Sequence, residues 1–208
     1  MIYPDQFIPV LEKNGYVIDV DNFIWNKVCA CIKMMEDEGI EPVPISVNVS
    51  RMHVYQEKFT ENLKDMAGKY GIDPKYIPLE ITESAFTKEE GSLFKKVQSL
   101  QGYGFKFSMD DFGSGYSSLG MLKSERVDEV KIDKTFVDDI ATDKGKVLLG
   151  NVIRMINELG IDMIAEGVET KEQADFLKEN GCMYAQGYYY YKPMPIEEFA
   201  KLLENSAR

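Results

Sequence analysis

The feature that most constrains the fold is an alternation of apolar stretches of strand length with amphipathic stretches of helix length. This alternation predicts parallel strands, because a crossover between two parallel strands needs about the length of a helix. Strands are expected at Val43–Ser50, Ile77–Glu83, Lys106–Phe112, Val127–Asp133, Asp162–Val168 and Tyr184–Tyr190. Helices are expected at Asp21–Glu38, Glu57–Tyr70, Lys88–Gln101, Gly145–Leu159, Lys171–Asn180 and Ile196–Glu204. No linker-like composition interrupts the chain, so we expect a single domain over residues 1–208.

Each expected strand also carries a polar or charged residue near its carboxyl end. Side chains alternate faces along a strand with a period of two, and Asp110, for example, lies opposite Phe107 and Met109. The polar residues placed in this way are Asn48, Glu80, Asp110, Lys131, Glu166 and Gln186. An open doubly wound sheet would bury both strand faces, whereas a (β/α) barrel gathers the carboxyl ends of its strands on one rim, where barrel enzymes keep their active sites. We therefore expect an α/β fold of the TIM-like barrel type.

The stretch "SMDDFGSGYSSLG" places two adjacent aspartates, Asp110 and Asp111, before a Gly-Ser-Gly loop. Converging carboxylates with few basic residues indicate a divalent cation bound through oxygen. By itself the stretch is also compatible with an Asx-turn into a glycine loop, and a lone glutamate at a strand end is more often a solvated loop charge. The same placement on six strands favours a metal site.

Charge and composition limit the partners and the location of the protein. The formal net charge of −11 argues against a DNA or RNA polymer as partner, although a small phosphate ligand is compatible with it if metals or a lysine supply positive charge. No apolar run reaches the ~18 residues of a membrane span, and the start lacks the features of a signal peptide. Cys29, Cys31 and Cys182 are an odd number in no zinc-like spacing, which predicts reduced thiols in a cytoplasmic protein.

Two further stretches are interpreted as structural. His53, the sole histidine, is predicted to be a surface residue, so histidine acid–base chemistry is not expected. The run Tyr188–Tyr191 is predicted to belong to the last strand and its packing rather than to a base-stacking platform.

Seven stretches resemble the motifs of one known family, in the family's order and spacing from Pro4 to about Leu203. They are "PDQFIPVLEKNGYV", "SVNVS", "LEITES", "DDFGSGYSSLGML", "VKIDKTFV", "IAEGVET" and "QGYYYYKPMP". The family is that of EAL domains, bacterial cyclic-di-GMP phosphodiesterases. The resemblance implies a modified (β/α)₈ barrel and metal-dependent hydrolysis of cyclic-di-GMP to linear pGpG in second-messenger signalling. Two Mg²⁺ or Mn²⁺ ions would clamp the phosphodiester and lower the pKa of an attacking water, and Ca²⁺ would bind without supporting turnover.

The resemblance also implies a role for individual residues. The implied metal ligands are Asn48, Glu80, Asp110, Asp111 and Glu166. The implied catalytic residues are Lys131, Glu166 and Asp111, of which Lys131 contacts the attacking water or the phosphate. The residues implied to bind substrate or support the loop are Gln186, Glu83, Glu169, Gly113 and Gly115.

One departure from the family pattern concerns the Glu-Ala-Leu motif, which lies upstream of "PDQFIP" in a complete domain. Since the chain begins "MIYPDQFIP", we expect an N-terminally truncated barrel with about six of eight strands, without one metal-ligating glutamate and with low or no activity alone. Open strand edges would then favour a homodimer or larger oligomer, and the chain would belong to a larger sensory protein. Two alternatives stand beside the enzyme. One is a non-catalytic cyclic-di-GMP receptor or protein-interaction module, and the other is an enolase-type barrel enzyme, which does not explain the ordered motifs.

Overall fold

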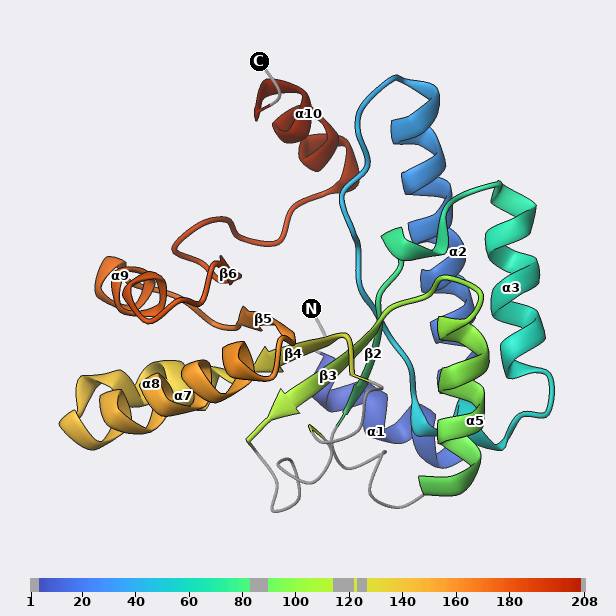
Figure 1. Cartoon of the computed structure of the whole chain (residues 1–208). Helices are drawn as coiled ribbons and strands as arrows, with labels where there is room; N and C mark the ends of the chain where they lie inside the picture. Colours follow the sequence, from blue (N-terminus) through green and yellow to red (C-terminus); the bar gives the residue numbers. More distant parts are fainter. Residues whose placement is uncertain (1–3, 83–89, 114–121, 123–126, 207–208) are drawn as a thin grey trace. The chain divides into compact units, whose positions relative to one another are not determined.

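A computed structural model of the chain describes residues 4–82, 90–113, 122 and 127–206 (Figure 1). The six described strands follow one another in the sheet in the order of the sequence, β1-β2-β3-β4-β5-β6. The pairs β1/β2, β3/β4, β4/β5 and β5/β6 are parallel, as predicted from the strand–helix alternation. The chain divides into two compact units. Unit 1 contains Met1–Ile81, Lys88–Lys106 and Pro195–Arg208, and unit 2 contains Thr82–Thr87 and Phe107–Met194.

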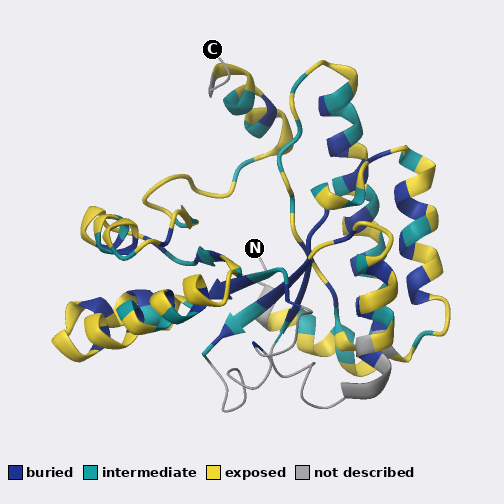
Figure 2. Cartoon of the chain, in the orientation of Figure 1, coloured by how far each residue is buried: buried dark blue, intermediate teal, exposed yellow. Residues whose placement is uncertain are grey.

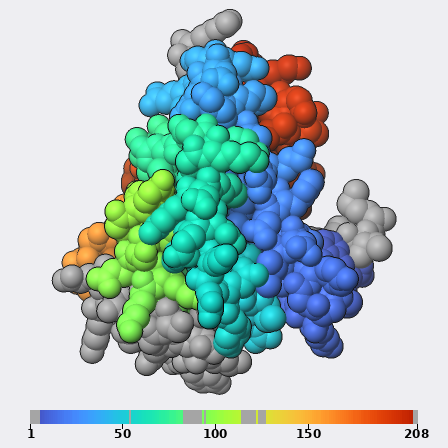
Figure 3. All heavy atoms as spheres, turned by 90° about the vertical axis from the view of Figure 1, so that its right-hand side faces the viewer, coloured from blue at the N-terminus to red at the C-terminus, as the bar shows by residue number. Residues whose placement is uncertain are grey.

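Unit 1 is a helical layer beside two short strands. Its elements are α1 (Pro4–Asn14), α2 (Val17–Asp37), β1 (Val47–Asn48), the 3₁₀ helix η1 (Arg51–Tyr55), α3 (Phe59–Tyr70), the 3₁₀ helix η2 (Pro74–Tyr76), β2 (Leu79–Thr82), α5 (Glu90–Gln101) and α10 (Ile196–Ser206). Helix α3 lies between α5 and α2 in the face shown in Figure 3, and it contacts both. Helix α2 buries Trp25, Cys29 and Ile32, which recur at helical spacing and so form one apolar face.

Unit 2 carries the remaining strands and their helices. Its elements are β3 (Phe107–Phe112), β4 (Glu129–Ile132), α7 (Lys134–Asp138), the 3₁₀ helix η3 (Asp139–Ala141), α8 (Asp143–Glu158), β5 (Asp162–Ala165), α9 (Lys171–Glu179) and β6 (Tyr184–Ala185). Side-chain caps start its two longer helices: Thr142 accepts a hydrogen bond from the amide of Gly145, and Thr170 forms a capping box with Gln173. The capping box at Thr170 confirms the sequence prediction. The second predicted box pairs Thr87 with Glu90, and Thr87 lies outside the described residues.

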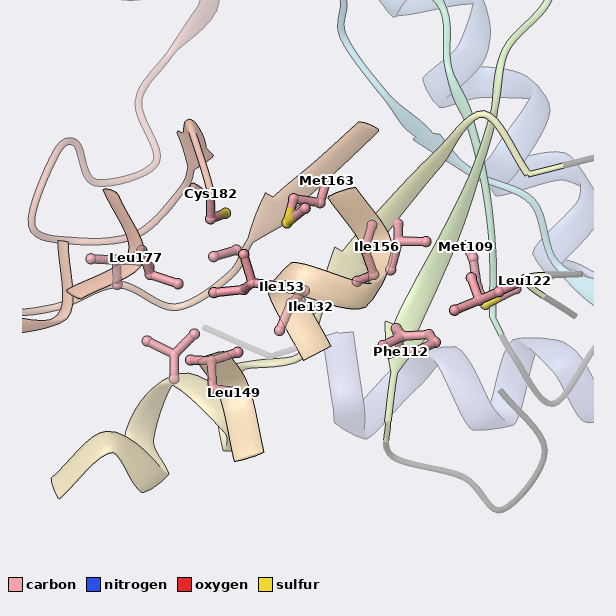
Figure 4. Close-up of a cluster of buried hydrophobic side chains, with 14 of the residues drawn as sticks. Met109, Phe112, Leu122, Ile132, Leu149, Ile153, Ile156, Met163, Leu177 and Cys182 are labelled. Atoms are coloured by element: carbon pink, nitrogen blue, oxygen red, sulfur yellow. The ribbon is translucent and has the colours of Figure 1, made fainter. Parts of the chain in front are cut away.

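The core of unit 2 lies between α8 and the strands (Figure 4). Leu149, Ile153 and Ile156 recur at helical spacing on α8 and are fully buried. They belong to one cluster with strand residues such as Ile132 and Met163. Figure 2 shows the consequence for the helices of each unit, which combine buried and exposed residues along their length. The carboxyl ends of the strands that this core supports carry the candidate site.

The structure differs from the sequence prediction in several elements. The strands are shorter than expected, and helices α1 and α7 were not expected. The run Tyr188–Tyr191 does not extend the last strand, because the amides of Tyr190 and Tyr191 both donate to the carbonyl of Gly187 and close a turn.

None of the described helices combines the length and the apolar character that crossing a bilayer requires.

The prediction that His53 is a surface residue is wrong. Its ring is 1% exposed and packs against Trp25, with ring centroids 4.5 Å apart. His53 Nε2 lies 3.0 Å from Asp21 Oδ2, and Nδ1 lies 3.2 Å from Gln56 Oε1. The partner carboxylate supplied by α2 makes burial of the imidazole favourable, because both ring nitrogens find hydrogen-bond partners.

Candidate metal centre

The two adjacent aspartates at the end of β3 lie at a β-bulge. Met109 pairs with Val130 and Phe112 pairs with Ile132, so two residues of β3 face one residue of β4. Asp111 has φ +56°. Among the residues that the structure describes, it is the one non-glycine residue with a positive φ. Aspartate tolerates this left-handed conformation better than most residues. In a regular strand the two side chains would point to opposite faces, and the bulge is what lets both carboxylates face one place.

A third carboxylate completes a cluster with these aspartates. Asp110, Asp111 and Glu166 each offer a carboxylate oxygen, and these oxygens lie within 4.8 Å of one another. All three residues are half-buried. Oxygen ligands at this spacing suit one hard divalent cation such as Mg²⁺ or Mn²⁺.

Lys131 and Gln186 contact the cluster through Glu166. Lys131 Nζ lies 2.6 Å from Glu166 Oε1 and 3.7 Å from Asp110 Oδ1, and the residue is 5% exposed. Gln186 Nε2 donates to the same Glu166 oxygen at 2.7 Å. Glu166 is therefore held from two sides, by an ammonium group and by an amide.

Backbone hydrogen bonds between neighbouring strands place Lys131, Glu166 and Gln186 side by side. The amide of Glu166 donates to the carbonyl of Ile132, and the amide of Gln186 donates to the carbonyl of Ala165. Lys131, Glu166 and Gln186 thus occupy the carboxyl ends of three neighbouring parallel strands. The period-two reading of the sequence anticipated this arrangement within unit 2.

The other predicted residues of this region have separate positions. Gly113 has φ +98°, a conformation that side chains rarely adopt, and a Cβ at this position would overlap the ring of Phe136, so any other residue would require the ring to move. Glu169 is exposed and forms an ion pair with Lys134 at 2.5 Å, which raises the pKa of Lys134. Glu83 and Gly115 lie outside the described residues.

The two predicted ligands of unit 1 are neighbours on adjacent strands. Asn48 and Glu80 are paired in the β1/β2 ladder, with Asn48 exposed and Glu80 buried. Helix α2 holds the strand end, since Trp25 Nε1 donates to the carbonyl of Asn48 at 3.0 Å. Asp21 accepts from the amide of Ser50 at 3.1 Å and from His53.

Sequence reasoning missed this support for Asn48. Its partners on α2 lie more than twenty residues away, and no local pattern connects them. The available signal was composition, because the chain has one tryptophan and one histidine, and each carries a hydrogen-bonding group that burial must satisfy.

Comparisons with known proteins agree on one family. The family model described as "EAL domain" matches residues 1–193. The signaling protein YkoW of Bacillus subtilis (strain 168) is 34% identical over 201 residues, covering 96% of this chain and 25% of YkoW. The probable cyclic di-GMP phosphodiesterase PdeG of Escherichia coli (strain K12) is 32% identical over 203 residues, covering 97% of this chain and 40% of PdeG. The chain thus spans well under half the length of these curated relatives.

A solved structure has the same fold. The phosphodiesterase PaMucR, in its complex with c-di-GMP, superposes with a TM-score of 0.89 at 30% sequence identity, covering 95% of this chain and 81% of that chain.

Proposed function

Because the chain belongs to the EAL domain family, we propose that it hydrolyses cyclic-di-GMP to linear pGpG in bacterial second-messenger signalling. Its fold is α/β, a TIM-like barrel of EAL type of which six parallel strands are described. The observation that carries the proposal is the carboxylate cluster of Asp110, Asp111 and Glu166 beside Lys131. The family match covers residues of both units, which supports one EAL-type domain over residues 1–208.

In this proposal the residues of the chain bind the cations, orient the reacting groups and offset the negative charge of the phosphate. Asp110, Asp111 and Glu166 would hold Mg²⁺ or Mn²⁺, and the proposal keeps Asn48 and Glu80 as further ligands of a two-metal site. When bound, these cations supply Lewis-acid chemistry to a phosphodiester and to water. Lys131 would offer positive charge where the phosphate accumulates negative charge during attack by water.

The remaining predicted residues orient the reacting groups or support the neighbouring loops in this proposal. Gln186, through its 2.7 Å hydrogen bond, orients the Glu166 carboxylate and meets substrate or water. Glu83 and Gly115 keep the loop-supporting roles that the family pattern implies, and Glu169 supports the turn after Glu166.

The proposal extends to partners and location. The relatives' greater length supports a place within a larger sensory protein. The proposal keeps a homodimer or larger oligomer, as expected from the sequence. Three free buried cysteines support a reducing compartment, the cytoplasm.

The test is a turnover assay of the chain with cyclic-di-GMP and Mn²⁺, in which the product is identified by mass. We expect linear pGpG with Mn²⁺ or Mg²⁺ at a low rate, in line with the low activity expected of this chain alone, and substrate binding without turnover when Ca²⁺ replaces them. Glu166→Gln should abolish turnover, whereas Asp175→Asn, which removes an equal charge from an exposed ion pair on α9, should not.

Each result separates the candidate functions. Binding of cyclic-di-GMP without hydrolysis under every metal would replace the enzyme with a receptor. Absence of both binding and hydrolysis would refute the proposal, as would turnover that is unchanged in Glu166→Gln.

A further inference from the structure

We infer that the short helix α7 is the positioning element of the metal centre, with Phe136 and Gln173 as the residues through which it acts. Helix α7 follows directly after β4, the strand of Lys131. It touches the segments that follow Asp111 and Glu166, so it can fix the spacing of the three carboxylates. The inference rests on the proposed function, because it assigns residues that hold the proposed cation site in shape.

The first contact joins α7 to the segment after the aspartates. The partly buried ring of Phe136 lies against Gly113, two residues after Asp111, so closely that a Cβ there would overlap the ring. Gly113 also has φ +98°, a conformation that side chains rarely adopt. The ring therefore limits the position of Gly113, the residue that directly follows β3.

The second contact joins α7 to the segment after Glu166. Gly167 has φ +68°, and a Cβ there would lie 2.5 Å from Lys134 Cγ and 2.7 Å from Lys134 Cβ. The ammonium group of the same lysine pairs with Glu169. Lys134 thus contacts this turn at two points, immediately after the ligand Glu166.

The third contact is a hydrogen-bonded bridge through Gln173. Its Oε1 accepts from the amides of Glu169 and Thr170, at 2.7 and 3.0 Å. Its Nε2 donates back to α7, to the carbonyl of Val137 at 3.4 Å and to Asp138 Oδ1 at 3.3 Å. Gln173 is 8% exposed, and both ends of its carboxamide have partners, so its orientation is fixed.

An ordinary helix cap would explain only half of this bridge. A glutamate at the same position would cap α9 equally well, because carboxylates accept from backbone amides in a capping box. The two donor contacts to α7 need the amide nitrogen. The choice of glutamine therefore points to the link between α7 and the turn of Glu166, and it offers a substitution that breaks the link while keeping the cap.

The test is Mn²⁺ affinity of the full chain, followed by electron paramagnetic resonance of bound Mn²⁺, in Gln173→Glu and a matched control. Gln173→Glu retains the acceptor for α9 but loses both donors and faces Asp138. We expect an affinity about 10–100-fold weaker and an altered Mn²⁺ spectrum, because partners that orient metal ligands have effects of this size. The control Asn180→Ala removes the hydrogen bond that Asn180 Nδ2 donates to the carbonyl of Phe176 at the end of α9 in the same unit, and we expect a lower Tm with unchanged affinity and spectrum.

A double-mutant cycle tests the aromatic contact. We expect Gly113→Ala to weaken Mn²⁺ binding at least ~10-fold, and to weaken it clearly less when Phe136→Ala has removed the ring. An equal loss in both backgrounds would mean that the left-handed backbone alone requires glycine, which would overturn the role of Phe136.

The outcomes separate this inference from the function on which it rests. If the wild-type chain does not bind Mn²⁺, the proposed metal site is wrong and the inference falls with it. If the wild-type chain binds Mn²⁺ and Gln173→Glu binds it equally well, the inference alone is wrong. An equal loss of affinity in Asn180→Ala would also overturn it, because general destabilisation would then explain the effect.

Discussion

Asp21 of unit 1 and Asp110 of unit 2 are both largely shielded acids, with side chains 12% and 15% exposed, but their charges are treated differently. Asp21 receives hydrogen bonds from His53 and from the amide of Ser50, so the protein itself satisfies the carboxylate. Asp110 accepts from the amide of Asp111 and is gathered with Asp111 and Glu166 beside the ammonium group of Lys131. These four side chains, when ionised, carry a formal charge of −2. The difference teaches that unit 1 uses an acid for structure, whereas unit 2 accumulates negative charge that a cation can offset.

The largest expected effect on stability comes from removing the imidazole that hydrogen-bonds to Asp21. His53→Phe keeps an aromatic ring beside Trp25 but leaves Asp21 without the imidazole, so the free energy of unfolding should fall by about 3–5 kcal/mol. Urea unfolding, followed by Trp25 fluorescence, measures the change.

The control for this prediction is Lys33→Met, which breaks the exposed ion pair with Asp37 on the same helix. It should cost less than about 1 kcal/mol. Equal costs for the two substitutions would show that the buried pair contributes no more than an exposed one.

A smaller effect is expected from the lysine of the acidic cluster. Lys131→Met should lower turnover about 100-fold or more, because a positive charge beside the reacting phosphate is lost. Mn²⁺ affinity should not fall, since the ammonium group competes with a cation for Glu166. Steady-state kinetics and Mn²⁺ titration give the two numbers, with Lys171→Met on the surface of α9 as control. A parallel collapse of Mn²⁺ affinity would assign Lys131 to holding the cluster rather than to the phosphate.

The smallest expected effect concerns the buried thiol of Cys29 in unit 1. Burial raises the pKa of Cys29 from 9.0 to about 11, so the folded chain holds this proton more tightly than the unfolded chain. The resulting stability is present below pH 9 and is lost as the pH rises toward 11, by about 1 kcal/mol at pH 10. Urea unfolding at pH 7.5 and pH 10 tests this, and Cys29→Ala should reduce the loss. An identical pH dependence in the two proteins would count against the thiol as its source.

The sequence predicted those parts of the fold and site that depend on local periodicity. Six helices lie close to their expected ranges, and the ends of β4, β5 and β6 carry Lys131, Glu166 and Gln186 as the period of two indicated. The metal-ligand and catalytic roles of these residues stay predictions.

What the sequence did not predict depends on contacts between distant residues or on irregular backbone. Strict alternation would turn Asp111 away from Asp110, and the β-bulge that reverses this has no periodic signature. His53 was misplaced because its partner Asp21 lies 32 residues away. Helix α7 is only five residues long, too short to show an amphipathic pattern.

The central claim is that Asp110, Asp111 and Glu166 form a site for a divalent cation, and Mn²⁺ titration of the wild-type chain and Asp110→Asn tests it most directly. Asparagine retains the shape and the oxygen that accepts from the amide of Asp111, so the change is mainly one of charge. We predict saturable Mn²⁺ binding to the wild-type chain, at least about 10–100-fold weaker binding to Asp110→Asn, and unchanged binding to Asp175→Asn. Mn²⁺ binding of equal strength in all three proteins, or in none, would contradict the claim.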